Sequence, residues 1–288
     1  RSTGAVLTRS RVHNPGSKPA DSVRATVFSS GSNSPIECLV ILSADTGAVV
    51  VDLEIMEEMD EEAVALRAAL RTALAAAGDP ARAEQQRRYL KSAMEMYGVG
   101  VPQTRRIAQA TAASYPALWR DAARWEAVLR RVWDAAERRE ERFAVLAIIR
   151  SKHSAPHANR LESLDLYEHL LRSGAWWDLV DETSHAVGLV VLAHPGAAAR
   201  IRAWARDVDL WVRRSAIICQ LQHKERTDLS LLGDVIEANQ GDVEFFIRKA
   251  IGWALRDYAR TDGPWVRVFV ESHPGLSPLS RREALKHL

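Results

Sequence analysis

From Glu57 to the C-terminus, apolar residues recur at steps of three and four, with short interruptions at glycine, proline, aspartate and asparagine. This period is typical of amphipathic α-helices and predicts about a dozen short ones. Since glycine and proline both interrupt helices, we expect helix ends at Gly78 to Pro80, Gly98 to Pro102, Ser154 to Pro156, Gly174, Pro195 and Gly263 to Pro264.

The first 55 residues follow a different pattern. Ser, Gly and Pro cluster at residues 14–19 and 29–35, which predicts loops or little structure. Two apolar runs, Cys38 to Leu42 and Val49 to Val51, flank the turn-like Asp45, Thr46 and Gly47 and predict a hairpin, which alone is marginal in water. We therefore expect a weakly structured extension at residues 1–56, with no assigned function, and a helical domain at residues 57–288.

One internal repeat is visible: DVDLWVRR at residues 207–214 recurs as DVEFFIRK at residues 242–249, 35 residues later. Helical units with that period predict an all-α, HEAT-like α-solenoid, a curved stack of antiparallel helix pairs with a long concave surface. Each copy ends in adjacent cations, Arg213 with Arg214 and Arg248 with Lys249. A single pair indicates a solvated face, but two copies in register favour a stripe that follows a phosphate backbone.

Charge and cysteine content narrow the class of protein. The net charge is +2, and the chain after residue 60 carries 34 basic and 29 acidic side chains, a mild lean toward nucleic acid. Two distant cysteines without a CxxC argue against a disulfide framework or a zinc knuckle. No run approaches the roughly 18 apolar residues of a membrane span, and the first residues do not resemble a signal peptide. We expect a soluble, cytoplasmic monomer without a membrane partner.

The tryptophan pair Trp176–Trp177 opens the most unusual segment. If a helix starts near Ala175, Trp177 and Asp181 lie one turn apart on one face, with an indole beside a carboxylate. Trp176 then points elsewhere, as a core anchor. Taken alone, Asp181 equally fits a helix cap or an ion-pair partner. Trp253, which follows a mid-helix glycine, is by itself more typical of a core than of a site.

Several ordered motifs lie between Gln85 and Leu288. They are YLK at residues 89–91, GV at 98–99, WWD at 176–178 with Asp181, WVRR at 211–214 with QL at 220–221, FFIRKAIGWALR at 245–256 and LSPLS at 276–280. In this order they give the chain a resemblance to the AlkD-like alkylpurine DNA glycosylases of the DNA alkylation repair group. Gln222 and His223 depart from it, since the family often carries Lys and an aromatic residue there, which implies weaker backbone binding at that point.

The resemblance implies a DNA glycosylase that removes cationic N3- or N7-alkylated purines from duplex DNA. It implies a catalytic cluster of Trp177, Asp181 and Trp253, with Arg214 on the DNA backbone. The further DNA-binding residues implied are Tyr89, Lys91, Arg213, Arg248 and Lys249.

No cofactor or metal is implied by any motif. His153 and His157 have the spacing of metal ligands on a helix, but Pro156 between them disfavours a continuous helix, and we interpret them as solvated. Two alternatives to the glycosylase stay open. One is a non-catalytic DNA-binding relative with the same groove, and the other is a helical-repeat scaffold for protein partners.

Overall fold

The computed structural model describes residues 5–11, 21–28, 35–43 and 47–288, with side chains from Met56 onward. The described chain divides into two compact units between Ala65 and Leu66. Each unit is described by itself, and the expected boundary between residues 56 and 57 lies inside helix α1 (Leu53–Ala76).

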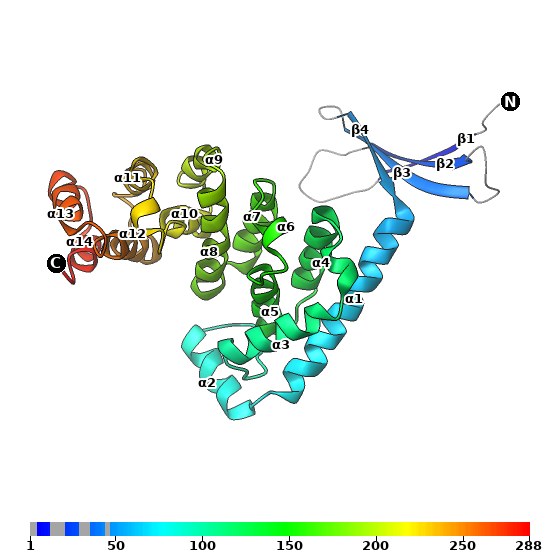
Figure 1. Ribbon diagram of the computed structural model, residues 1–288, viewed down its shortest axis with the longest axis horizontal. Coiled ribbons are helices and arrows are strands. Elements are labelled where there is room, and N and C mark those ends of the chain that lie inside the picture. Colours follow the sequence, from blue (N-terminus) through cyan, green and yellow to red (C-terminus); the bar gives the residue numbers. More distant parts are fainter. Residues whose placement is uncertain (1–4, 12–20, 29–34, 44–46) are drawn as a thin grey trace. The chain divides into compact units, whose positions relative to one another are not determined.

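Unit 1 contains an antiparallel sheet of four strands, in the order β1-β2-β3-β4 (blue in Figure 1). The strands are β1 (Ala5–Arg11), β2 (Asp21–Phe28), β3 (Pro35–Ser43) and β4 (Gly47–Asp52). The predicted hairpin is confirmed as β3 and β4, which pair Val40 with Val50. Where the sequence predicts only that one marginal hairpin, two further strands extend the ladder, and sheets of three or more strands are more stable than a lone hairpin. The expected loops at residues 14–19 and 29–34 and the turn residues Asp45 and Thr46 lie outside the described residues.

All the regular elements of unit 2 are helices, which confirms the predicted HEAT-like α-solenoid. Its helices after α1 are α2 (Pro80–Leu90), α3 (Val101–Ala113), α4 (Ala122–Asp134), α5 (Arg139–Ile149), α6 (Ala155–Ala158), α7 (Ser163–Gly174), α8 (Trp177–Ala193), α9 (Ala197–Trp204), α10 (Leu210–Ile218), α11 (Leu229–Glu237), α12 (Phe245–Tyr258), α13 (Gly263–Ser272) and α14 (Pro278–Ala284), with short 3-10 turns η1 (Pro116–Trp119) and η2 (Lys224–Arg226). The predicted helix ends at glycine and proline all fall at or between these helices.

Five helices form one continuous row: α5, α8, α10, α12 and α14, each packed against the next. The intervening helices α7, α9, α11 and α13 each pack against a helix of that row, as the successive pairs in Figure 1 show. The interface within each pair is apolar and fully buried, for example at Leu171, Val187, Ile201 and Ile251. No helix in the described part of the chain combines the length and apolar character needed to cross a membrane.

The 35-residue repeat seen in the sequence also appears in the contacts between successive helix pairs of the stack. Arg172 pairs with Asp207, Arg200 with Asp165, and the Gln222 backbone N–H donates to Asp257, each across 35 residues. The two copies of the internal repeat place the starts of α10 and α12 at equivalent positions, Leu210 and Phe245. The period therefore corresponds to one step of the stack.

Candidate functional site

Helix α8 carries two of the predicted catalytic residues on its first turns. Helix α7 ends at Gly174, Ala175 takes a left-handed conformation with φ of 35°, and the extended Trp176 is the N-cap. Helix α8 therefore starts at Trp177, two residues later than expected. Trp177 and Asp181 are still four residues apart on one helix, so they share a face as predicted.

The Asp181 carboxylate is gripped by Arg214 of α10. Nε and Nη2 of Arg214 donate to the two carboxylate oxygens at 2.7 Å and 2.9 Å. The remaining guanidinium nitrogen, Nη1, donates to the carbonyl of Phe246 on α12 at 2.7 Å. Arg214 thus joins three successive helices of the row, and its side chain is only 6% exposed, against 16% for Asp181. As the structure stands, the guanidinium expected on the DNA backbone is occupied by Asp181.

Burial sets the ionisation of the groups around Asp181. Loss of solvent raises the pKa of Asp181, and Arg214 works against that effect by favouring the carboxylate. One turn later on α8, burial lowers the pKa of His185, whose ring also feels the charges of Asp181 and of Asp257 on α12. The carboxylates of two different helices therefore act on the same imidazole.

Aromatic rings flank the start of α8 on two sides. Tyr89 of α2 meets Trp177 edge to face, with ring centroids 6.0 Å apart and planes at 86°. Tyr89 is 75% exposed. Trp176 instead packs against Trp211 and Phe246, with centroids 5.7 Å and 5.6 Å away. Trp176 therefore packs within an aromatic cluster as expected, but its side chain is only half-buried and not part of the core.

Trp253 lies on α12, which is separated from α8 by α10 in the row. Its indole is half-buried, and it precedes by one turn Asp257, whose charge reaches His185. The preceding Gly252 is explained by helix crossing, since a Cβ there would lie 2.5 Å from the Cβ of Glu283 on α14. The role of Trp253 in catalysis stays a prediction.

The predicted DNA-binding cations differ in how far they are engaged. Arg213 pairs with Asp242 at 3.1 Å and donates to the Asp207 carbonyl, and Lys249 pairs with Glu283 at 3.0 Å. Lys91 has no ion pair within the part of the chain that the structure describes. Among the same residues, the buried Nε of Arg248 has no hydrogen-bond partner. Lys91 and Arg248 are therefore the members of this set that hold no ion pair among the described residues.

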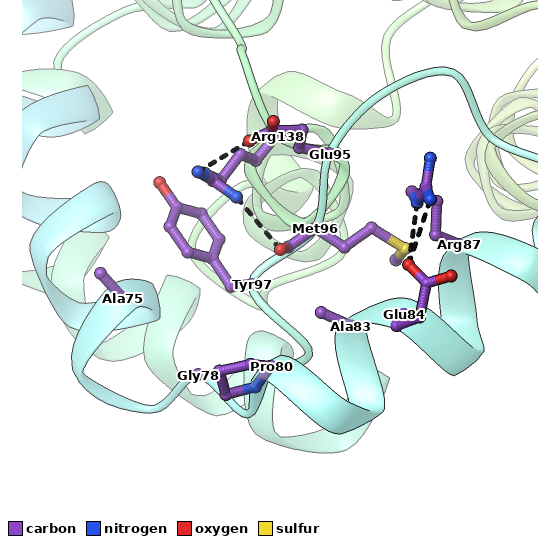
Figure 2. Close-up of a pocket in the computed structure, with 10 residues that line it drawn as sticks. All are labelled: Ala75, Gly78, Pro80, Ala83, Glu84, Arg87, Glu95, Met96, Tyr97 and Arg138. Carbon is purple, nitrogen blue, oxygen red and sulfur yellow. Dashed lines mark hydrogen bonds and ion pairs between the residues drawn. The ribbon is translucent and has the colours of Figure 1, made fainter.

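A large cavity of about 710 Å³ lies beside α2, lined by Ala75, Gly78, Pro80, Ala83, Glu84, Arg87, Glu95, Met96, Tyr97 and Arg138 (Figure 2). Glu84 pairs with Arg87, and Arg138 pairs with Glu95 and lies over the Tyr97 ring. None of the predicted site residues lines it. Pro80, Ala83, Glu84 and Arg87 lie on the face of α2 turned away from Tyr89, because residues 84 and 89 are about 140° apart around a helix.

His153 and His157, expected to be solvated, both contact Trp119. His157 hydrogen-bonds the Trp119 carbonyl at 3.2 Å, and the His153 ring packs on the Trp119 ring with centroids 5.6 Å apart. His157 is half-buried, so the expectation of a solvated side chain is wrong for it. No cluster of three or more candidate metal ligands occurs among the residues that the structure describes.

Sequence reasoning missed the acids that neutralise the site's arginines. Arg139, the first residue of α5, grips Asp178 of α8 through two nitrogens, with Nε to Oδ2 at 2.9 Å. Asp242 and Glu283 similarly hold Arg213 and Lys249. The one available signal was Asp242, which stands inside the repeat itself. The distance between Arg139 and Asp178 in sequence left no signal for that pair.

Comparison with known proteins agrees with this architecture. A family model described as DNA alkylation repair enzyme matches residues 70–288, and no curated protein matches the chain. A solved structure from Enterococcus faecalis, described as a predicted DNA alkylation repair enzyme, is 26% identical with a TM-score of 0.65, covering 73% of this chain and 96% of that one. AlkD2 from Streptococcus mutans, at 15% identity and a TM-score of 0.52, covers 71% and 98% respectively and shares the fold. Since the matched residues make up well over half of this chain, the chain belongs to the DNA alkylation repair enzyme family.

Proposed function

We propose that this protein hydrolyses the N-glycosidic bond of purines made cationic by alkylation at N3 or N7 in duplex DNA. Such a base is already a good leaving group, so the reaction requires no acid to protonate it. As the bond breaks, positive charge develops on the deoxyribose. Stabilisation of that charge and orientation of a water molecule are what a protein can contribute.

The observation that carries the proposal is the Asp181 carboxylate, partly desolvated and held by two hydrogen bonds from the Arg214 guanidinium, which favours its charged form against the effect of burial. A carboxylate in a site of reduced polarity stabilises nearby positive charge far more than one in water. Arg214 uses two parallel hydrogen bonds to fix its orientation. The 16% of Asp181 that remains exposed leaves an edge for the sugar and the water.

The bond changes balance with water as the only co-reactant. The C1′–N bond breaks, its electron pair neutralises the alkylated base, and a water oxygen bonds to C1′. The proton released from water passes to the Asp181 carboxylate or to solvent. The products are a neutral alkylpurine and an abasic site.

We propose that the indoles of Trp177 and Trp253 line the path of the cationic nucleotide. An indole face stabilises a cation by about 0.5 to 2 kcal/mol, more when water is excluded. The edge-on contact with Tyr89 supports this role for Trp177, because it fixes the ring while the phenol stays exposed. Lys91 and Arg248 would contact phosphates first, and Arg213, Arg214 and Lys249 only after exchanging a carboxylate for a phosphate. We expect the protein to act as a cytoplasmic monomer.

A non-catalytic DNA-binding relative is the second candidate, favoured by one observation. Arg214 occupies both oxygens of Asp181, which leaves fewer lone pairs to orient water. The same fold and groove would then bind damaged DNA without cleaving it.

The experiment is release of free 7-methylguanine or 3-methyladenine from methylated duplex DNA by the purified protein, in a buffer with chelator. We expect base release together with abasic sites in equal amount. DNA binding that weakens steeply with salt but releases no base would support the non-catalytic relative. Absence of both would support a protein-binding scaffold.

A further inference from the structure

The ion pair between Arg139 and Asp178 is almost completely buried. The side chains are 5% and 7% exposed, and both carboxylate oxygens accept from the guanidinium. Buried ion pairs are weak contributors to stability, because desolvation of the two charges offsets their attraction. Since stability alone does not account for this pair, we look for its role in the geometry of the helices that it joins.

Arg139 also holds the segment that follows α2. Its Nη1 donates to the Ser92 hydroxyl at 3.4 Å, and its backbone N–H donates to the Glu95 carbonyl at 3.0 Å. The neighbouring Glu140 accepts the backbone N–H groups of residues 97–99 at 2.8 to 3.1 Å. The first turn of α5 thus anchors the whole connection from α2 to α3.

This segment starts at the end of α2, next to the predicted DNA-binding residues Tyr89 and Lys91. Tyr89 lies in the last turn of α2, and Lys91 ends the helix in a left-handed conformation with φ of 50°. Ser92, the residue that Arg139 contacts, comes directly after it. At the other end of the same guanidinium, Asp178 directly follows Trp177. One arginine therefore binds next to both partners of the Tyr89–Trp177 contact.

We propose that Arg139 and Asp178 are a positioning pair, which fixes the start of α8 against the end of α2 and so sets the edge-on contact of Trp177 with Tyr89. The effect of this pair on base release rests on the proposed function. The geometry of the contact does not, and it is measured separately. Neither residue touches the substrate in this account.

The test compares removal of one partner with removal of both. Asp178→Asn alone leaves a buried, unpaired guanidinium and is expected to lower the melting temperature by roughly 10 °C. Arg139→Met with Asp178→Leu replaces both charged groups by apolar side chains, and the melting temperature should return close to that of the wild type. If the pair sets geometry, the double variant recovers stability without recovering the ring contact.

The ring contact is observed by fluorine NMR of protein labelled with 3-fluorotyrosine. The chain has five tyrosines, and Tyr89→Phe assigns the resonance of Tyr89. Trp177→Leu gives the reference position of that resonance without the indole. We expect the double variant to move the Tyr89 resonance toward this reference, and its single-turnover rate of base release to fall ten-fold to a hundred-fold, since small misplacements have effects of that order.

Leu232→Ala on α11 is the matched control, because Leu232 is buried in the stack and is not part of this network. It should lower the melting temperature while leaving the Tyr89 resonance and the rate unchanged. A double variant with wild-type stability, resonance and rate would overturn the proposal and leave the pair a purely structural one. If the wild type releases no base, the proposed function fails, and the resonance alone decides the positioning role.

Discussion

Two arginine–aspartate pairs join α8 to its neighbours in the row. Arg139 of α5 holds Asp178, and Arg214 of α10 holds Asp181, each through Nε and Nη2. Both side chains of the first pair are almost completely buried, whereas the Asp181 carboxylate of the second pair is 16% exposed. The same type of contact therefore has two consequences. At Asp178 it holds α8 against α5, and at Asp181 it orients a carboxylate that solvent can still reach.

The largest expected effect in this comparison follows removal of Arg214. Arg214→Gln leaves the Asp181 carboxylate buried without its counter-charge, at a cost of about 3 to 5 kcal/mol in the free energy of unfolding. Because Arg214 lowers the pKa of Asp181, its loss should also raise that pKa, so that activity starts to fall at a higher pH on acidification. Denaturant unfolding and a pH–rate profile measure the two effects. An unchanged acid limb would mean that Asp181 does not control the rate.

A buried histidine lies where α8 meets the turn that follows α10, and its pKa makes this contact sensitive to acid. His223 is buried where Gly188 lets the two segments approach, and burial lowers its pKa to about 4. Since the folded pKa lies below the unfolded value of about 6.5, its stabilising contribution is complete above pH 6.5 and is lost as the pH falls toward 4. The loss amounts to roughly 3 kcal/mol at most.

His223→Gln stays neutral at every pH and isolates this contribution. The fall in melting temperature between pH 7 and pH 4.5 should be smaller in the variant than in the wild type. An equal fall in both proteins would show that other groups carry the acid sensitivity.

The contribution of the Trp177 and Trp253 indoles to catalysis is tested by removing each of them. Trp177→Ala and Trp253→Ala should each lower the rate of base release by about two-fold to thirty-fold, the equivalent of 0.5 to 2 kcal/mol of cation stabilisation. Trp265→Ala is the matched control, since this half-buried indole packs on Tyr258 and Phe269 within the last helices. A loss of rate as large in the control would indicate a general effect of indole removal on the stack.

The smallest expected effect separates free from engaged cations. Lys91→Gln should reduce the slope of log binding constant against log salt concentration by about 0.9, the value for one phosphate contact. Arg213→Gln should reduce it by less, because its guanidinium already pairs with Asp242. Titration of duplex DNA at several salt concentrations measures both. A reduction of about 0.9 in both variants would place both side chains on phosphates.

The sequence predicted the helical stack because the signals involved are local. Helix ends follow glycine and proline, and the repeat at residues 207–214 and 242–249 reports one step of the solenoid. The shared face of Trp177 and Asp181 follows from helical spacing alone. The partner of each charged side chain does not, since Asp181 meets Arg214 and Asp178 meets Arg139 only once the helices are stacked. For that reason the sequence predicted a cationic stripe without showing that Arg213, Arg214 and Lys249 in it are paired with acids.

Substitution of Asp181 by Asn tests the central claim most directly, by single-turnover release of 7-methylguanine from duplex DNA at saturating protein. The change keeps the shape of the side chain and removes its charge. We predict a rate about 10² to 10³ times lower than that of the wild type, as for loss of one electrostatic stabiliser. Saturating protein keeps any change in DNA affinity that follows release of Arg214 from Asp181 out of this rate. Equal rates for Asn and Asp at this position would contradict the account.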